Sequence, residues 1–169
     1  MRLTQWTDYS LRVLMYCAIH AERAQPVTIT EIAEVHGISR SHLMKIVQEL
    51  SARGLLETTR GRGGGVRLLQ PAQAITVGAV VRATETDFAL VECFDAERNQ
   101  CRLRGRCRLQ SVLEQALAAY LAVLDGVTLA DLVAEPQTWQ GLQALPIPFA
   151  VAPGVAGGKT EVCSAQKFE

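Results

Sequence analysis

The chain has 169 residues with 17 basic and 17 acidic side chains, so its formal net charge at pH 7 is zero. This length accommodates one domain with a small appended element. Hydrophobic residues make up 49% of the sequence and aromatic residues only 5%, which favours a helical core of aliphatic side chains. No apolar run approaches the roughly 20 residues of a membrane span, and the opening MRLTQWTDYS lacks the apolar stretch of a signal peptide. We therefore expect a cytoplasmic protein with no membrane partner.

The zero net charge hides a separation of charge along the chain. Residues 36–70 carry six basic and two acidic side chains, a net charge of +4, whereas residues 109–135 carry four acidic side chains and no basic one. Such an asymmetry between segments is more informative than the total. The first of these segments is suited to bind phosphate.

Residues 7–20 have the spacing of an amphipathic helix, with Thr7 as the expected N-cap. The apolar residues that recur at helical spacing are Leu11, Leu14, Met15 and Ala18. From Thr28 onward, the sequence predicts two helices joined by a short turn. Thr30 is the expected cap of the first, which presents Ile32, Ala33 and Val35 on one face. Gly37 ends that helix.

Ser39 is the expected N-cap of the second helix, and Gly54 closes it. Its apolar face is formed by Leu43, Ile46, Val47 and Leu50. Two helices joined by a glycine-containing turn form the helix-turn-helix pattern, although an ordinary helical hairpin has the same periodicity. In the DNA-binding interpretation, the candidate contact residues are Thr28, Ser39, Arg40, Ser41, His42 and Lys45.

Two strand-like runs follow, LLETT and VRLL, on either side of RGRGGG. A glycine-rich hairpin is costly in chain entropy, so it makes sense where the backbone approaches a ligand closely. Directly after a helix-turn-helix, this hairpin is interpreted as a wing. Arg60 and Arg62 would contact phosphate or enter the minor groove, where the potential is most negative. A flexible turn is the alternative.

Residues 76–85 predict a short helix, and residues from about 107 to 126 predict a long one with a wide apolar stripe. A small winged domain has little surface left to cover such a helix, so we expect it to form a homodimer, which also suits DNA with two half-sites. The expected domains are residues 1–75 for DNA binding, 76–135 for the cysteine loop and dimerisation helix, and 136–169 as a disordered tail rich in Pro, Gly and Ala.

Three of the five cysteines, Cys93, Cys101 and Cys107, lie in one arginine-rich loop, CFDAERNQCRLRGRC. A cytoplasmic location disfavours a disulfide, few histidines are available to activate a nucleophile, and the tight cysteine pairs of structural zinc sites are missing. An iron–sulfur cluster accepts loose spacing and a non-cysteine fourth ligand. Cys17, on the first helix, and Cys163, in the tail, are interpreted as a core thiol and an incidental one.

Taken together, LTQWTDYSLRVLMY, HGISRSHLMKIVQEL, RGRGGGVRL, the cysteine triad and TLADLV resemble the Rrf-type winged-helix repressors that carry iron–sulfur clusters, and within them the nitric-oxide-sensing branch. The resemblance covers about the first 135 residues. It implies a mostly α, winged helix-turn-helix dimer whose cluster is held by Cys93, Cys101 and Cys107. An acidic residue of the partner chain completes the site in such proteins, and the matching residue here is Asp8. A first-turn carboxylate favoured by the helix dipole is the alternative for Asp8.

The cluster-assembly branch of the family has a histidine three residues past the last cysteine, where this chain has Gln110. The resemblance therefore implies a non-enzymatic transcriptional repressor that binds a double-stranded DNA operator and is released from it when nitric oxide damages the cluster. Whether the cluster is 4Fe–4S or 2Fe–2S stays open. A regulator that uses the cluster for iron or redox status, and one that uses the loop for zinc or thiol chemistry, remain the alternatives.

Overall fold

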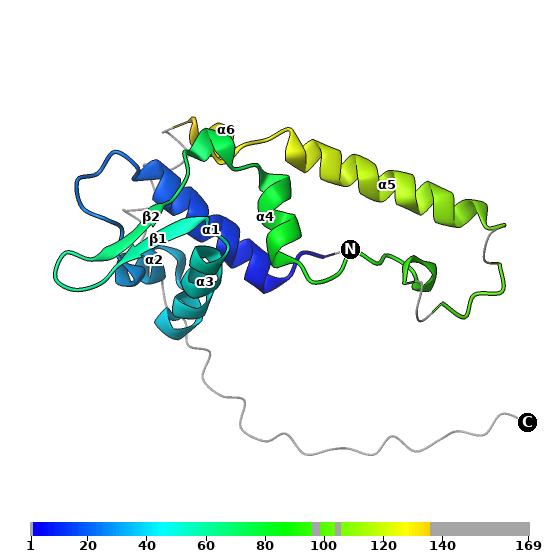
Figure 1. Ribbon diagram of the computed structural model, residues 1–169, viewed down its shortest axis with the longest axis horizontal. Coiled ribbons are helices and arrows are strands. Elements are labelled where there is room, and N and C mark those ends of the chain that lie inside the picture. The colour runs from blue at the N-terminus through cyan, green and yellow to red at the C-terminus, as the bar shows by residue number, and fades with distance from the viewer. Residues whose placement is uncertain (1, 96–98, 104–105, 136–169) are drawn as a thin grey trace, which may run out of the picture.

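The computed structural model describes residues 2–95, 99–103 and 106–135. Its elements in chain order are α1 (Gln5–Ile19), α2 (Ile29–His36), α3 (Arg40–Ala52), β1 (Leu56–Thr59), β2 (Gly65–Leu68), the 3-10 helix η1 (Ala72–Ala74), α4 (Val77–Thr84), the 3-10 helix η2 (Glu92–Phe94), α5 (Arg108–Asp125) and α6 (Leu129–Val133). The predicted mostly α fold with a two-stranded wing is confirmed. Figure 1 shows a body built around α1, from which α5 extends to one side. The predicted disordered tail and Cys163 lie outside the described residues.

The predicted N-caps of α1 and α2 are wrong by three and two residues, respectively. The α1 helix begins after Thr4, whose Oγ1 accepts a hydrogen bond from the backbone N–H of Thr7, so Thr7 lies inside the helix and is fully buried. The α2 helix begins after Thr28 rather than Thr30. Thr28 and Glu31 form a capping box in which each side chain accepts a hydrogen bond from the other residue's backbone N–H. This reciprocal pairing satisfies two otherwise unpaired backbone donors, which fixes the helix start.

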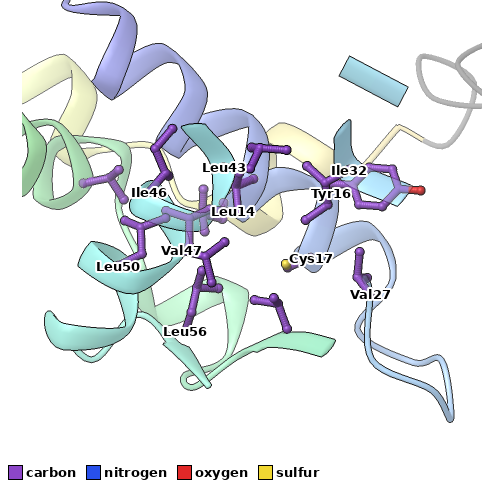
Figure 2. Packing of buried hydrophobic residues seen from close by; sticks show 14 of the residues in the cluster. Leu14, Tyr16, Cys17, Val27, Ile32, Leu43, Ile46, Val47, Leu50 and Leu56 are labelled. Carbon is purple, nitrogen blue, oxygen red and sulfur yellow. The ribbon is translucent and has the colours of Figure 1, made fainter. Parts of the chain in front are cut away.

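The hydrophobic core surrounds α1, which contacts α2, α3, α4, α6 and strand β2. All four apolar residues predicted for α3 are buried there, as Figure 2 shows: Leu43, Ile46, Val47 and Leu50. On α1 the prediction was less accurate, because of its four residues only Leu14 is fully buried; its neighbours in the core are Val13 and Cys17. Cys17 is 2% exposed, which confirms it as a core thiol.

The wing is an antiparallel hairpin in which Leu56 pairs with Leu68 and Thr59 with Gly65. Its turn contains Gly61 and Gly63 with φ of 95° and 77°. This left-handed backbone region is open to glycine without strain, which explains the glycine-rich sequence. Because β1 contacts α3, the hairpin is held beside that helix (Figure 1).

The C-terminal segment returns to the body after α5. The backbone N–H of Val77 donates to the carbonyl of Val127, and that of Leu129 donates to the carbonyl of Ile75. Leu129 of α6 is fully buried in the same core as α1. Both α4 and α6 therefore pack with the winged helix-turn-helix in one body, whereas α5 has no fully buried residue. The division of the chain at residue 75 into two domains stays a prediction.

Candidate nucleic-acid interface and cysteine loop

The third helix presents a polar face to solvent. Ser39 caps α3 as predicted, because its Oγ accepts a hydrogen bond from the backbone N–H of His42. Arg40, Ser41 and Lys45 are exposed. The apolar residues between them point into the core. The pattern of polar and apolar residues along α3 therefore determines which face of the helix is exposed to solvent.

A groove of about 750 Å³ lies between α3, the start of α2 and the wing. It gathers three of the predicted contact residues, Thr28, Arg40 and Arg60, from three separate elements. It is also lined by Met44 and Gln48, which the sequence analysis missed. Their signal was present, since they follow Arg40 at intervals of four residues and so share its helix face. Ser41, Lys45 and Arg62 are exposed outside this groove lining.

The positive charges near the groove differ from four arginines elsewhere on the body. Arg12, Arg23, Arg53 and Arg82 each form a salt bridge, with Asp8, Glu31, Glu49 and Asp125 respectively. Within the described residues, no side-chain hydrogen bond or salt bridge is formed by Arg40, Lys45, Arg60 or Arg62. Unpaired cations on one face attract a polyanion, and Lys and Arg that neutralise phosphates supply the sequence-independent part of DNA affinity.

His42 lies differently from its exposed neighbours on α3. It is half-buried, and its ring centroid lies 5.9 Å from that of Trp6 and 5.3 Å from that of Tyr9, both on α1. The ring of His42 therefore contacts α1 rather than standing free in solvent. Thr28 is also engaged, because its hydroxyl accepts the capping hydrogen bond of α2. His42 and Thr28, like the capping residue Ser39, are thus predicted DNA contacts that have structural partners in the protein.

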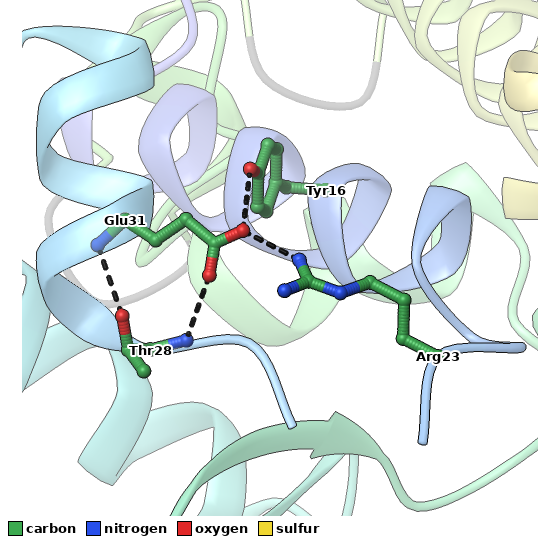
Figure 3. A network of polar contacts seen from close by, with 4 residues as sticks. All are labelled: Tyr16, Arg23, Thr28 and Glu31. Atoms are coloured by element: carbon green, nitrogen blue, oxygen red, sulfur yellow. Dashed lines mark hydrogen bonds and ion pairs between the residues drawn. The ribbon is translucent and has the colours of Figure 1, made fainter. Parts of the chain in front are cut away.

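Glu31 connects α1, α2 and the loop between them, as Figure 3 shows. Besides the Thr28 backbone N–H, its carboxylate accepts hydrogen bonds from the Tyr16 hydroxyl and the Arg23 guanidinium. Burial alone would raise the pKa of Glu31, but these hydrogen bonds outweigh burial and lower it. Burial and the charge of Glu31 raise the pKa of Tyr16 to about 12, so its hydroxyl remains a donor. The network fixes the start of α2 at the edge of the groove.

The cysteine loop lies beside α5. Cys93 is in η2, Cys101 follows in the loop, and Cys107 is the N-cap of α5; all three thiols are free and half-buried. Across residues 2–95, 99–103 and 106–135, no group of three Cys, His, Asp or Glu side chains is gathered closely enough to hold a metal ion. The predicted triad thus shares one loop, but its thiols are spread along it.

The start of this loop and the residues before it border a recess that α5 also lines. Phe88 and Phe94 line a recess with Leu117 of α5. Within the loop, the backbone N–H of Gln100 donates to Glu92, and that of Cys101 donates to the side-chain oxygen of Asn99. Three exposed arginines, Arg102, Arg106 and Arg108, surround the last two cysteines, and within the described residues they have no salt-bridge partner.

Asp8, the predicted fourth ligand, lies in the first turn of α1. Its carboxylate accepts hydrogen bonds from Arg12 Nε at 3.1 Å and Nη2 at 2.7 Å. The side chains of Asp8 and Arg12 are 46% and 41% exposed. Asp8 is therefore accessible to a second molecule, with Arg12 as its partner within this chain.

A helix-turn-helix, a wing and a groove lined by unpaired cations define a winged-helix DNA-binding transcriptional regulator. The chain belongs to the Rrf2 family, described as an iron-dependent transcriptional regulator, which matches residues 3–135. It is 54% identical over 134 residues to the HTH-type transcriptional regulator NsrR of Bacillus subtilis, covering 79% of this chain and 90% of that protein. It is 45% identical over 145 residues to NsrR of Halalkalibacterium halodurans, covering 86% and 99%.

Solved structures show the same fold. CymR, the global cysteine regulator of B. subtilis, matches with a TM-score of 0.66 and 26% identity over 79% of this chain and 97% of its own. T. potens IscR matches with a TM-score of 0.62 and 26% identity over 81% and 90%. The relatives are transcriptional regulators, so the prediction of a regulator rather than an enzyme is confirmed. Among the described residues, no helix has the length and apolar character needed to cross a membrane.

Proposed function

We propose that this chain is a homodimeric repressor that binds a double-stranded DNA operator and holds an iron–sulfur cluster through which nitric oxide controls that binding. One observation carries the proposal: Cys93, Cys101 and Cys107 are free, half-buried thiols in one loop of a winged-helix regulator. The iron-dependent description of the family and the identity to NsrR proteins support it.

The chemistry of the loop fits a cluster. Thiolates are the usual ligands of iron–sulfur clusters, and nearby arginines offset the negative charge of a thiolate-bound cluster. Cys107 lies at the N-terminus of α5 without a side-chain capping bond, beside exposed Arg106 and Arg108. Cys93, Cys101 and Cys107 would hold the cluster, with Asp8 of a second copy as the fourth ligand. When bound, the cluster supplies an iron site that a small ligand such as nitric oxide can reach.

The surface of α5 supports a homodimer. Five of its exposed apolar residues recur at intervals of three and four: Leu109, Val112, Ala116, Ala119 and Val123. Leu109, Val112 and Val123 are 60%, 52% and 68% exposed. This is the spacing of a coiled-coil seam, in which each apolar row is covered by another helix. A second copy of α5 would cover it and would bring the loop of one copy toward α1 of the other.

The α1 helix offers a physical route from the cysteine loop to DNA. Asp8 shares α1 with Trp6 and Tyr9, which contact His42 on the recognition helix α3. In a dimer that holds the cluster, Asp8 would leave Arg12 and bind at the partner's loop. Without the cluster, Asp8 would pair with Arg12 again, and α1 would shift against His42. Allosteric couplings typically amount to about 1–3 kcal/mol, which changes DNA affinity about 5- to 150-fold.

The test is an anaerobic absorption spectrum of the full-length protein titrated with nitric oxide, with DNA binding measured at each addition at fixed salt. We expect a visible band that bleaches as DNA is released. Cys93→Ala, Cys101→Ala and Cys107→Ala each abolish the band, whereas Cys17→Ala, the control outside the loop, retains it. A coloured protein indifferent to nitric oxide contradicts the signal and favours iron or redox status. A colourless, zinc-containing protein contradicts the cluster.

A further inference from the structure

The exposed face of α3 contains one large apolar side chain among polar ones. Met44 is 54% exposed, and it lies between Arg40 and Gln48 on the same helix face. All three line the groove that faces the wing. Within the described residues, neither Arg40 nor Gln48 forms a side-chain hydrogen bond or salt bridge. Met44 is therefore left uncovered at the centre of a surface whose polar neighbours are also free to bind a ligand.

The position of Met44 suits contact with base edges. Recognition helices place their N-terminal residues against the bases of the major groove, and Arg40 is the first residue of α3. Met44 follows about 6 Å further along the helix, since each residue rises about 1.5 Å. That interval spans roughly two base pairs of about 3.4 Å each. Arg40 and Met44 can thus face neighbouring steps of one half-site.

The chemistry of the Met44 side chain indicates which base it would contact. In the major groove, thymine offers an apolar 5-methyl group, whereas the other base edges present hydrogen-bond donors and acceptors. Methionine has no strong donor, and its flexible, polarisable thioether packs well against irregular apolar surfaces. We infer that Met44 is a specificity-determining residue that reads the 5-methyl group of one thymine in each operator half-site. The inference rests on the proposed DNA-binding function and adds the base that is read.

The experiment starts from a randomised DNA duplex library, from which the full-length, anaerobically purified protein selects its preferred sequence at fixed salt. Each thymine of the selected duplex is then replaced by deoxyuridine, which lacks only the methyl group. We expect one position per half-site at which this replacement weakens binding about fourfold, the value for burying one methyl group. The Met44→Ala variant binds the thymine and deoxyuridine duplexes at that position equally well.

Two control variants separate base reading from other roles. Leu69 is also 54% exposed but lies outside the groove, so Leu69→Ala retains the deoxyuridine effect. Lys45 is exposed beside Met44, and Lys45→Ala weakens all duplexes alike because phosphate contacts carry no sequence information.

Two results overturn the inference while leaving the proposed function intact. One is a selected sequence at which Met44→Ala shows the same deoxyuridine response as the wild type. The other is a selected sequence at which no thymine responds. If the wild type enriches no sequence at all, the proposed function fails, and the inference fails with it.

Discussion

Asp125, the last residue of α5, accepts hydrogen bonds from both terminal nitrogens of Arg82 on α4, at 2.5 and 2.6 Å. The guanidinium of Arg82 lowers the pKa of this carboxyl group. Asp125 also lies so close to α4 that a Cβ added at Gly78 would be 2.0 Å from its Oδ1. The base of α5 is thus fixed to the body at a point where only a glycine leaves room.

This close approach predicts that Gly78→Ala is destabilising. The added Cβ would also lie 2.9 Å from the backbone nitrogen of Asp125, so α5 must shift away from α4. Overpacking of this kind costs about 1–3 kcal/mol in the free energy of unfolding, measurable by denaturant titration. A displaced α5 also changes the separation of the two α3 helices in the proposed dimer. DNA affinity therefore falls more for a duplex with two half-sites than for one with a single half-site.

Gly126→Ala is the matched control for Gly78→Ala, because it lies beside Asp125 and a Cβ there would be 3.5 Å from the nearest atom, an ordinary contact. We expect this variant to retain stability and the preference for two half-sites. Equal effects of the two substitutions would contradict the role of the α4–α5 contact.

Glu31→Ala is expected to destabilise the body by about 1–3 kcal/mol, since it removes the capping box of α2 and leaves the Tyr16 hydroxyl without its acceptor. The control is Glu34→Ala, an exposed position on the same helix whose side chain forms no hydrogen bond or salt bridge within the described residues. Urea titration of both variants gives the comparison. If Glu34→Ala lowers the free energy of unfolding as much as Glu31→Ala does, the effect comes from replacing any glutamate of α2 and not from losing the hydrogen bonds of Glu31.

The contribution of Glu31 also depends on pH. The pKa of Glu31 is lower in the folded protein than its ordinary value of 4.5. In the pH range of its titration, the folded state therefore binds fewer protons at Glu31 than the unfolded state does. The stabilisation is therefore fully present above the unfolded pKa and is lost as pH falls through the folded pKa. We expect the stability difference between wild type and Glu31→Ala to shrink in acid. A difference that stays constant down to the acid transition would contradict the lowered pKa.

Cys17 is expected to resist alkylation in the folded protein, unlike the loop thiols. Burial raises the pKa of Cys17 to about 12, so almost no reactive thiolate is present at neutral or mildly alkaline pH. Iodoacetamide at pH 8 followed by peptide mass spectrometry should label Cys93, Cys101 and Cys107 of cluster-free protein and leave Cys17 unmodified. Prior unfolding in urea is the control and exposes Cys17. Labelling of Cys17 without denaturant would contradict its place in the core.

Local patterns predicted the winged fold well because its signals lie within short stretches. The α3 helix has a cap, a clear apolar face and a closing glycine, and the wing has its turn glycines. The α1 face was less predictable, because helices and a strand surround α1 and its buried residues depend on long-range contacts. Thr7 and Thr30, the predicted caps, show the same limit: several threonines near a helix start can serve as caps, and the observed ones are Thr4 and Thr28.

The candidate site was predicted only in part for a related reason. The start of the second helix identified Arg40 and the glycine-rich hairpin identified the wing arginines, but Met44 was in neither the predicted apolar face nor the predicted DNA contacts. His42 was assigned to DNA together with its neighbours at the start of the second helix. Its contact with Trp6 and Tyr9 depends on residues more than thirty positions away, which no local pattern contains.

These aromatic contacts predict that His42 acts through shape rather than through its ring nitrogens. His42→Phe keeps an aromatic ring against Trp6 and Tyr9, so we expect it to retain both stability and operator affinity. His42→Ala removes two aromatic contacts worth about 0.5–1.5 kcal/mol each, so it should lower the unfolding free energy and weaken DNA binding together. Ser41→Ala, an exposed neighbour on α3, is the control for stability. If His42→Phe unfolds like the wild type but binds DNA more than about tenfold more weakly, then His42 contacts DNA directly, as its position in the sequence first indicated.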